Sequence, residues 1–245
     1  MTTAHTTART DMLDKVRKLF AKADSVAGTP EADTFNAKAF ELIARYGIDE
    51  TAARERAGEG PAPIITIELS LSGSYITQQR SLLQALARAL HCAPIYMTDR
   101  NLGITRDFVT GTANHSDRVQ VLFSMLMPQM LIGAGNVRPP FGSRVSTATY
   151  RRSWMRGFLN TVETRLAGAE AAAAEEQPGT GLVLLTDAKR AEAQLRADAA
   201  AKGVRLSTVR SSAQHDESAA GLGAKAGANV NLGGASIGGA RALTA

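Results

Sequence analysis

The stretch that decides the fold is Tyr150-Arg151-Arg152-Ser153-Trp154-Met155-Arg156-Gly157-Phe158, which opens a long helical pattern from about Ser146 to Ala174. In an α-helix each residue turns the chain by about 100°, so residues four apart share one face. Aromatic and apolar residues follow one another at this spacing: Tyr150, Trp154, Phe158, Val162 and Leu166. Such a face is typical of a helix packed against a core. We therefore predict a helix over residues 146–174 that buries the only tryptophan of the chain.

Three arginines lie beside or within this apolar face: Arg151, Arg152 and Arg156. Arginine and aromatic side chains together suit the binding of phosphates and bases, through forked hydrogen bonds and stacking. The simpler interpretation is a core helix with solvated arginines. We favour the core for the aromatic residues and leave both interpretations open for the arginines. Gly157 costs roughly 1 kcal/mol relative to alanine in a helix interior, which predicts that another backbone passes close to it.

The composition is that of a soluble globular protein. The chain has 245 residues, 44% of them hydrophobic and 21% charged, which argues against disorder. The formal net charge of +5 permits binding to nucleic acid without requiring it. The single cysteine, Cys92, excludes an internal disulfide framework and fits a reducing compartment. No apolar run approaches the roughly 20 residues of a membrane span, and residues 1–10 lack a signal-peptide core. We therefore expect a cytoplasmic protein, in a bacterium or its host, with no membrane partner.

Residues 11–50 predict an antiparallel hairpin of two helices. The apolar residues of the first helix recur at helical spacing: Met12, Val16, Leu19, Phe20 and Ala23. After Gly28, Thr29-Pro30-Glu31 is a strong helix start, with a hydroxyl N-cap, a proline at the first helical position and an acid in the first turn. Gly47 is expected to end the second helix.

Four segments of this hairpin carry a family resemblance: Lys15-Val16-Arg17-Lys18-Leu19-Phe20-Ala21-Lys22-Ala23, Pro30-Glu31-Ala32, Ala37-Lys38-Ala39 and Arg45-Tyr46-Gly47-Ile48. They resemble a small bacterial and phage domain, the domain of unknown function 2786. In such proteins the hairpin is often followed by a second uncharacterised domain with an aromatic-Arg-Arg-Ser-aromatic segment that ends in Gly-Phe, and residues 150–158 are similar to that segment. The resemblance implies no activity and no catalytic residues. It implies a phage, prophage or mobile-element context.

The first helix of the hairpin carries Lys15, Lys18 and Lys22 on the face opposite its apolar stripe. These lysines are either an ordinary solvated face, with acidic residues such as Asp11 and Asp14 nearby, or a surface that contacts phosphates. If they contact phosphates, removal of all three charges will flatten the salt dependence of binding.

A polar segment rich in glycine and proline, residues 51–63, is predicted to link the hairpin to a second unit, residues 64–226. We predict strands over 64–69, 95–97, 104–110, 182–185 and 204–209, and helices over 79–90, 116–132, 146–174, 187–201 and 213–225. This irregular mixture predicts an α+β domain, with a small mixed sheet and helices packed on it. Residues 227–245, rich in glycine and alanine, are predicted to be a flexible tail.

Catalytic motifs are sparse. The four histidines, His5, His91, His115 and His215, show no metal-ligand spacing. The chain also lacks the Gly-x-Ser-x-Gly elbow of hydrolases, the Walker A pattern and a strand-linked Gly-x-Gly-x-x-Gly. The motifs therefore predict no catalytic residue, metal ligand or cofactor.

Three functions stay open. The first is a nucleic-acid-binding module, whose candidate contact residues are Lys15, Lys18, Lys22, Arg151, Arg152 and Arg156. The second is an enzyme, such as a nuclease or peptidase, with a site assembled from distant histidines and a carboxylate. The third is a module that binds another protein. Two histidines and a carboxylate in one cleft would favour the enzyme, whereas a continuous basic strip across both units would favour binding.

Overall fold

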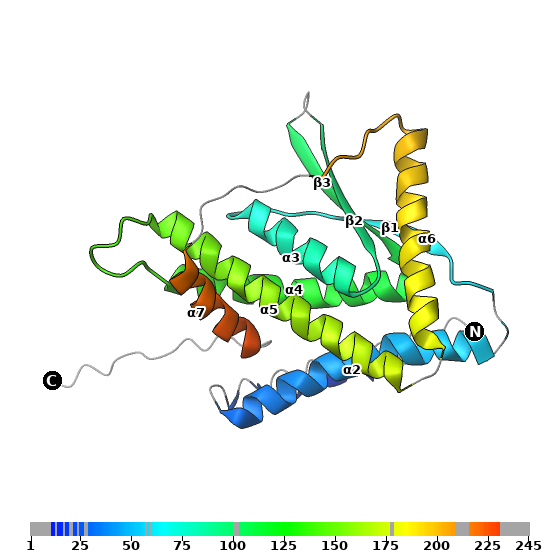
Figure 1. Ribbon diagram of the computed structural model, residues 1–245, viewed down its shortest axis with the longest axis horizontal. Coiled ribbons are helices and arrows are strands. Elements are labelled where there is room, and N and C mark those ends of the chain that lie inside the picture. Colours follow the sequence, from blue (N-terminus) through cyan, green and yellow to red (C-terminus); the bar gives the residue numbers. More distant parts are fainter. Residues whose placement is uncertain are drawn as a thin grey trace.

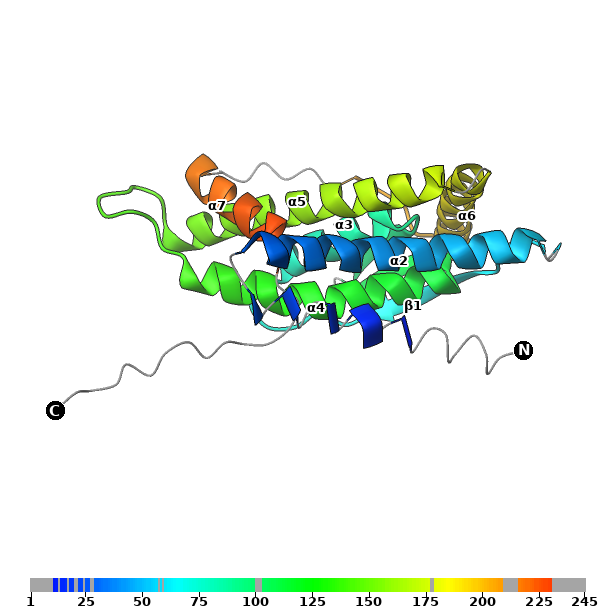
Figure 2. The same ribbon diagram turned by 90° about the horizontal axis from the view of Figure 1, so that it is seen from below.

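The computed structural model describes residues 11–230 except positions 13, 17, 20–21, 24, 27–28, 57, 59, 100–102, 177–178 and 209–215, and the described positions between 11 and 25 are helical. The elements that follow are α2 (Pro30–Arg56), β1 (Ile64–Leu69), α3 (Ile76–Ala89), β2 (Ala93–Asp99), β3 (Ile104–Thr112), α4 (Ala113–Asn136), α5 (Thr147–Glu175), α6 (Thr180–Ala201) and α7 (Glu217–Ala228). In Figures 1 and 2, α2, α4 and α5 run roughly along the long axis. Helix α6 stands across them at one end, and the α4–α5 connection projects from the other.

The α+β class is confirmed: helices pack around a three-stranded sheet of order β1-β3-β2. Both strand pairs are antiparallel, with Ile67 opposite Val109 and Ile95 opposite Phe108. The sheet is therefore antiparallel where a mixed sheet was expected. Helix α3 carries the chain from one edge of the sheet to the other, and Arg80 on this helix donates to both carboxylate oxygens of Asp107 on β3, at 2.6 and 3.1 Å.

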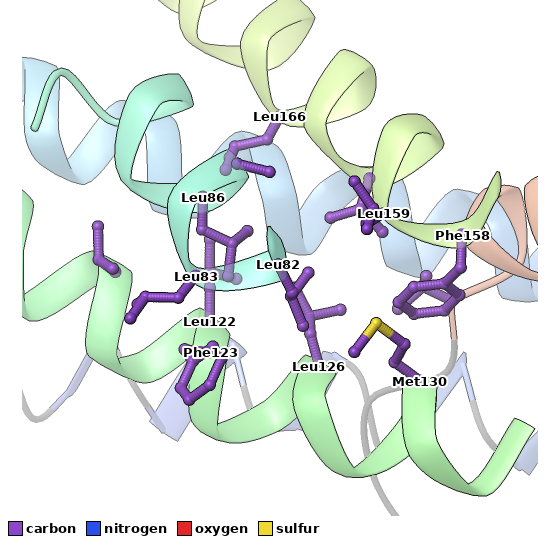
Figure 3. Packing of buried hydrophobic residues seen from close by; sticks show 14 of the residues in the cluster. Leu82, Leu83, Leu86, Leu122, Phe123, Leu126, Met130, Phe158, Leu159 and Leu166 are labelled. Atoms are coloured by element: carbon purple, nitrogen blue, oxygen red, sulfur yellow. The ribbon is translucent and has the colours of Figure 1, made fainter. Parts of the chain in front are cut away.

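The core lies where α3, α4 and α5 meet. Figure 3 shows its side chains: Leu82, Leu83 and Leu86 from α3, Leu122, Phe123, Leu126 and Met130 from α4, and Phe158, Leu159 and Leu166 from α5. Trp154 is 4% exposed and stacks on Phe158 with ring centroids 5.5 Å apart. Helix α5 is capped by the Ser146 hydroxyl, which accepts the Thr149 N–H. The predicted helix over 146–174 and the burial of its rings are thus confirmed.

The N-terminal helices share this core, because Met12, Val16, Phe40 and Ile43 belong to the same buried cluster. The prediction that Gly47 ends the second helix is wrong, since α2 continues to Arg56 and includes the first part of the expected linker. Gly47 lies instead against a side chain from α4: a Cβ at this position would be 2.1 Å from Nη1 of Arg118. A glycine at position 47 leaves room for the Arg118 side chain, and it does not end the helix.

Helices α5 and α7 pack backbone to backbone through glycines. A Cβ at Gly157 would lie 1.9 Å from the carbonyl oxygen of Ala220, and a Cβ at Gly223 would lie 1.8 Å from that of Trp154. Real Cβ atoms do not approach so closely, so glycine is required at both positions. This confirms the prediction that another backbone passes close to Gly157.

Two predicted strands are wrong. Residues 182–185 lie in the first turns of α6, and residues 204–208 have no regular structure. A run of four apolar residues fits a buried strand or a helix equally well, and here only Leu184 of the four is buried. Asp187 consequently lies inside α6 and not at its start. Helix α7 begins at Glu217, and residues 231–245 of the predicted tail lie outside the described residues.

Candidate functional site

The connection between α4 and α5, residues 137–146, holds an aromatic ring in solvent. The carbonyl of Pro140 accepts the N–H of Ser143 at 3.1 Å, and Gly142 has a φ of 80°, the value that the third position of a type II turn requires. Phe141 is the second residue of this turn, and its side chain is fully exposed. Figure 1 shows that the loop extends beyond the helices at this end of the molecule. The fold therefore presents the ring at a tip.

Exposed arginines precede and follow the tip along the chain. Arg138 and Arg144 flank it in the loop, and Arg152 and Arg156 follow on the first turns of α5. We name these four residues the arginine surface. Between Arg118 and Val162 the chain contains no aspartate or glutamate, so the segment that builds this end of the molecule supplies cations only.

Arg151 is not part of the arginine surface, because its guanidinium binds main-chain carbonyls at the end of α4. Its Nη2 donates to the carbonyl of Gly135 at 2.6 Å and its Nε to that of Val137 at 3.3 Å. The last carbonyls of a helix lack intrahelical partners and carry partial negative charge, which a guanidinium offsets. Arg151 therefore caps α4 and fastens the base of the loop to α5. Arg165 acts in the same way on α7, because its Nη1 donates to the carbonyl of Gly227 at 2.9 Å.

Carboxylates reach this end of the molecule from α7. The N–H of Asp216 donates to the Ser153 hydroxyl at 2.9 Å, which brings Asp216 and Glu217 beside α5. Asp216 caps α7, and its hydrogen bonds from Ser218 and from the N–H of Ala219 lower the pKa of its carboxyl group. The Asp216 carboxylate thus accepts hydrogen bonds from the first turn of α7.

The three candidate lysines lie on another element. Lys15, Lys18 and Lys22 are exposed on the N-terminal helical segment, and the Lys22 ammonium lies 4.8 Å from the centre of the Phe35 ring. In Figure 2 this segment lies on one side of α4 and α5 lies on the other. Arg152 and Arg156 therefore lie on the helix that follows the loop arginines, whereas the lysines lie on a separate segment.

A second cluster of polar residues joins α4, α5 and the turn before β2, and most of its side chains are buried. Nη2 of Arg118 on α4 donates to Oε1 of Glu170 on α5, and both residues are nearly fully buried. Nε2 of His91 lies 3.5 Å from Oε2 of the same glutamate, and the His91 and His115 rings are 5.6 Å apart. His215 lies outside the described residues. His91 and His115, two of the four histidines of the chain, therefore do come together with a carboxylate.

Burial controls the ionisation of this cluster. Desolvation holds the pKa of His115 well below 6.5, and the charges of Arg118 and His91 lower it further. Desolvation also raises the pKa of the Cys92 thiol to about 12, against the opposing charge of Arg118. His115 is therefore a neutral imidazole and Cys92 a protonated thiol at neutral pH. Neither is prepared to act as a general acid or as a thiolate nucleophile.

A cavity of about 400 Å³ lies beside this cluster. It is formed by the end of α2, residues 60–63, the start of α4 and the first turns of α6; its lining includes Arg54, Thr112, Asn114, Leu182 and Asp187. Burial raises the pKa of Asp187, while the adjacent Arg190 lowers it. The described lining includes neither His91 nor His115. The histidine pair is thus not part of the cavity lining.

The free energy of unfolding is expected to fall as the pH drops below about 6.5, the ordinary pKa of histidine, by at most about 1.4 kcal/mol per pH unit. In this range the unfolded chain takes up a proton at His115, whereas the folded chain, with its lowered pKa, does not. Above pH 9.0 the unfolded Cys92 thiol ionises before the folded one, so stability is lost again as the pH rises. Urea unfolding measured from below pH 6.5 to above pH 9.0 follows both losses of stability, the acid limb of the pH profile and its alkaline limb.

Two variants separate these contributions from those of other groups. His115→Gln is expected to reduce the slope of the acid limb, and Cys92→Ala the slope of the alkaline limb. The raised pKa of Asp187 acts in the opposite direction at lower pH, because the folded carboxylate binds a proton more readily than the unfolded one. An acid limb that is identical in His115→Gln would show that His115 does not cause it.

Sequence reasoning missed the residues that the fold brings together over long distances. Arg118 and Glu170 are 52 residues apart, and no periodicity links them. Phe141 carried a local signal, since Pro-Pro-Phe-Gly predicts a turn, but its full exposure follows from the projection of the loop. Within the described ranges, no group of three or more His, Cys, Asp or Glu side chains is arranged to hold a metal ion.

No helix in the described part is both long and apolar enough to cross a membrane.

Comparisons with known proteins concern only the N-terminal part of the chain. Searches of curated proteins and of solved structures found no match to the chain. Residues 11–50 match the model of a family described as a protein of unknown function (DUF2786), which confirms the resemblance of the N-terminal hairpin to that domain.

Proposed function

We propose that this protein binds nucleic acid through the arginine surface, in the cytoplasm of a bacterium and in a phage or mobile-element context. The observation that carries the proposal is the grouping of Arg138, Arg144, Arg152 and Arg156 at one end of the molecule, in a segment without acidic residues. Guanidinium groups donate forked hydrogen bonds to phosphate oxygens, and charge neutralisation supplies most of non-specific binding.

The arrangement supports contacts to the backbone and not to base edges. The four arginines come from a loop and from the side of a helix, and none of them lies on a strand or at the tip of a helix that could enter a groove. Arg151 holds the loop base in place. The lysines at positions 15, 18 and 22 are proposed as a second, independent contact surface.

A salt titration of binding tests the proposal. With short DNA or RNA, the variant Arg138→Gln/Arg144→Gln/Arg152→Gln/Arg156→Gln is expected to bind at least tenfold more weakly at low salt. The slope of log K against log salt should fall by roughly 0.7–0.9 for each phosphate that the variant no longer neutralises. Since all four side chains are exposed, the fold should be retained, which circular dichroism checks. Lys15→Gln/Lys18→Gln/Lys22→Gln measures the lysine surface separately.

The control removes the same net charge from other elements. Arg88, Arg106, Arg196 and Arg205 are exposed on α3, β3, α6 and the segment after α6, and their quadruple glutamine variant is expected to keep most of the binding and of the slope. An equal loss in this control would mean that net charge alone causes binding. Absence of salt-sensitive binding to single- and double-stranded DNA and RNA would reject the proposal.

The nuclease or peptidase alternative has one observation in its favour, the approach of His91, His115 and Glu170 beside a cavity. The burial of His115 argues against it, because a catalytic group must touch its substrate. The samples prepared for the salt titration also distinguish nucleic-acid binding from cleavage. Cleavage of the oligonucleotides that is lost in His115→Gln, with folding intact, would support the enzyme instead.

A further inference from the structure

The exposed ring of Phe141 has no structural role in the described fold. Its side chain is fully exposed, so it adds nothing to the core, and its apolar surface is available to be covered by a partner. The turn that carries it is well defined, by the hydrogen bond from the N–H of Ser143 to the carbonyl of Pro140. Pro139 and Pro140 fix their own backbone φ angles, and Arg151 holds the loop base. The ring is thus presented at low entropic cost.

The chemistry around the ring indicates its occupant. Arg138 and Arg144 flank Phe141 at equal separation in sequence, and both are exposed. A protein interface needs a broader apolar centre with a polar rim, and a membrane-surface helix needs a whole apolar face. A single aromatic ring between two cations matches the single-strand binding surfaces in which a base stacks on the ring and arginines contact its phosphates.

We propose that the α4–α5 loop is a single-strand binding site, in which an unpaired base stacks on Phe141 while Arg138 and Arg144 contact the adjoining phosphates. This inference rests on the proposed function and narrows it to unpaired DNA or RNA. Bases in a duplex are stacked on one another and offer no free face to the ring, so the loop discriminates single strands from duplexes without reading sequence.

Binding of a fluorescently labelled single strand and of a duplex with the same length tests this inference. Phe141→Ala is expected to weaken single-strand binding by roughly tenfold, within the range known for one stacked base, and to leave duplex binding within about twofold. The salt slope should stay unchanged, because no charge is removed. Ile132→Ala, which truncates another exposed apolar side chain, on α4, is the matched control and should change neither affinity.

Phe141→Trp gives a direct readout of stacking. This variant is expected to keep the single-strand affinity, and emission from the new indole should be quenched when a single strand binds. Trp154, the only tryptophan of the natural chain, is buried and supplies a constant background. Because position 141 is exposed, neither substitution threatens folding.

The outcomes separate this inference from the proposed function. Absence of binding to both oligonucleotides removes both proposals. Arginine-dependent binding that is equal for single strand and duplex, and unchanged in Phe141→Ala, overturns the stacking site alone. Binding to vesicles of anionic phospholipid in preference to either oligonucleotide, lost in Phe141→Ala, would assign the loop to a membrane surface and would overturn the stacking site too.

Discussion

Replacement of Arg118 by methionine is expected to lower the free energy of unfolding by about 3–5 kcal/mol. Methionine keeps much of the apolar packing but removes the guanidinium that donates to Glu170. The glutamate is 3% exposed, and its remaining ion-pair contact is His91, 3.5 Å away. An ionised carboxylate left in the core without its main partner costs far more than the intact pair contributes. Urea unfolding at neutral pH measures the loss.

Two further variants test this explanation. Arg118→Met/Glu170→Met removes both charges and is expected to recover most of the stability, because apolar replacement of a whole buried ion pair is often neutral or stabilising. Arg196→Met removes an exposed arginine that pairs with Glu192 and should cost less than about 1 kcal/mol. If the double variant is as unstable as Arg118→Met, packing of the arginine against Gly47 is responsible and the charge is not.

The substitutions Gly223→Ala and Gly221→Ala are expected to change stability in opposite directions, although the two residues lie on the same helix. A methyl group at position 223 would lie 1.8 Å from the carbonyl oxygen of Trp154, so α7 must move away from α5. Such overpacking costs about 1–3 kcal/mol, or more against rigid backbone. Gly221 is exposed with nothing within 4 Å, and alanine there should stabilise the helix by up to about 1 kcal/mol.

Tryptophan fluorescence reports whether α7 moves. Trp154 is buried, and Gly223 packs against its main-chain carbonyl. If α7 is displaced in Gly223→Ala, the tryptophan emission is expected to shift to longer wavelength. Gly221→Ala should leave the emission unchanged. Gly157→Ala and Gly168→Ala on α5 form a second matched pair, with 157 crowded and 168 open. Equal effects within both pairs would show that the α5–α7 contact is not tight in solution.

The strength of the local pattern decided where sequence reasoning succeeded. Helix α5 was predicted within a residue at each end, because its apolar stripe repeats along most of its length and Ser146 supplies a cap. The four-residue run 182–185 carries too little periodicity to separate strand from helix. Gly47 could be interpreted as a helix end or as packing space, and only its neighbour Arg118 distinguishes the two. The candidate arginines were proposed from the pattern of α5 alone, and they stay a prediction.

The sequence by itself determined the α+β class, the burial of Trp154 and the close approach of a second backbone at Gly157, because each follows from the properties of neighbouring residues. Only the tertiary structure decided that Arg118 faces Glu170, that α6 already begins at Thr180 and includes residues 182–185, and that Phe141 projects into solvent between two arginines. These features depend on which distant segments meet. Chain topology sets those contacts, and local periodicity carries no information about them.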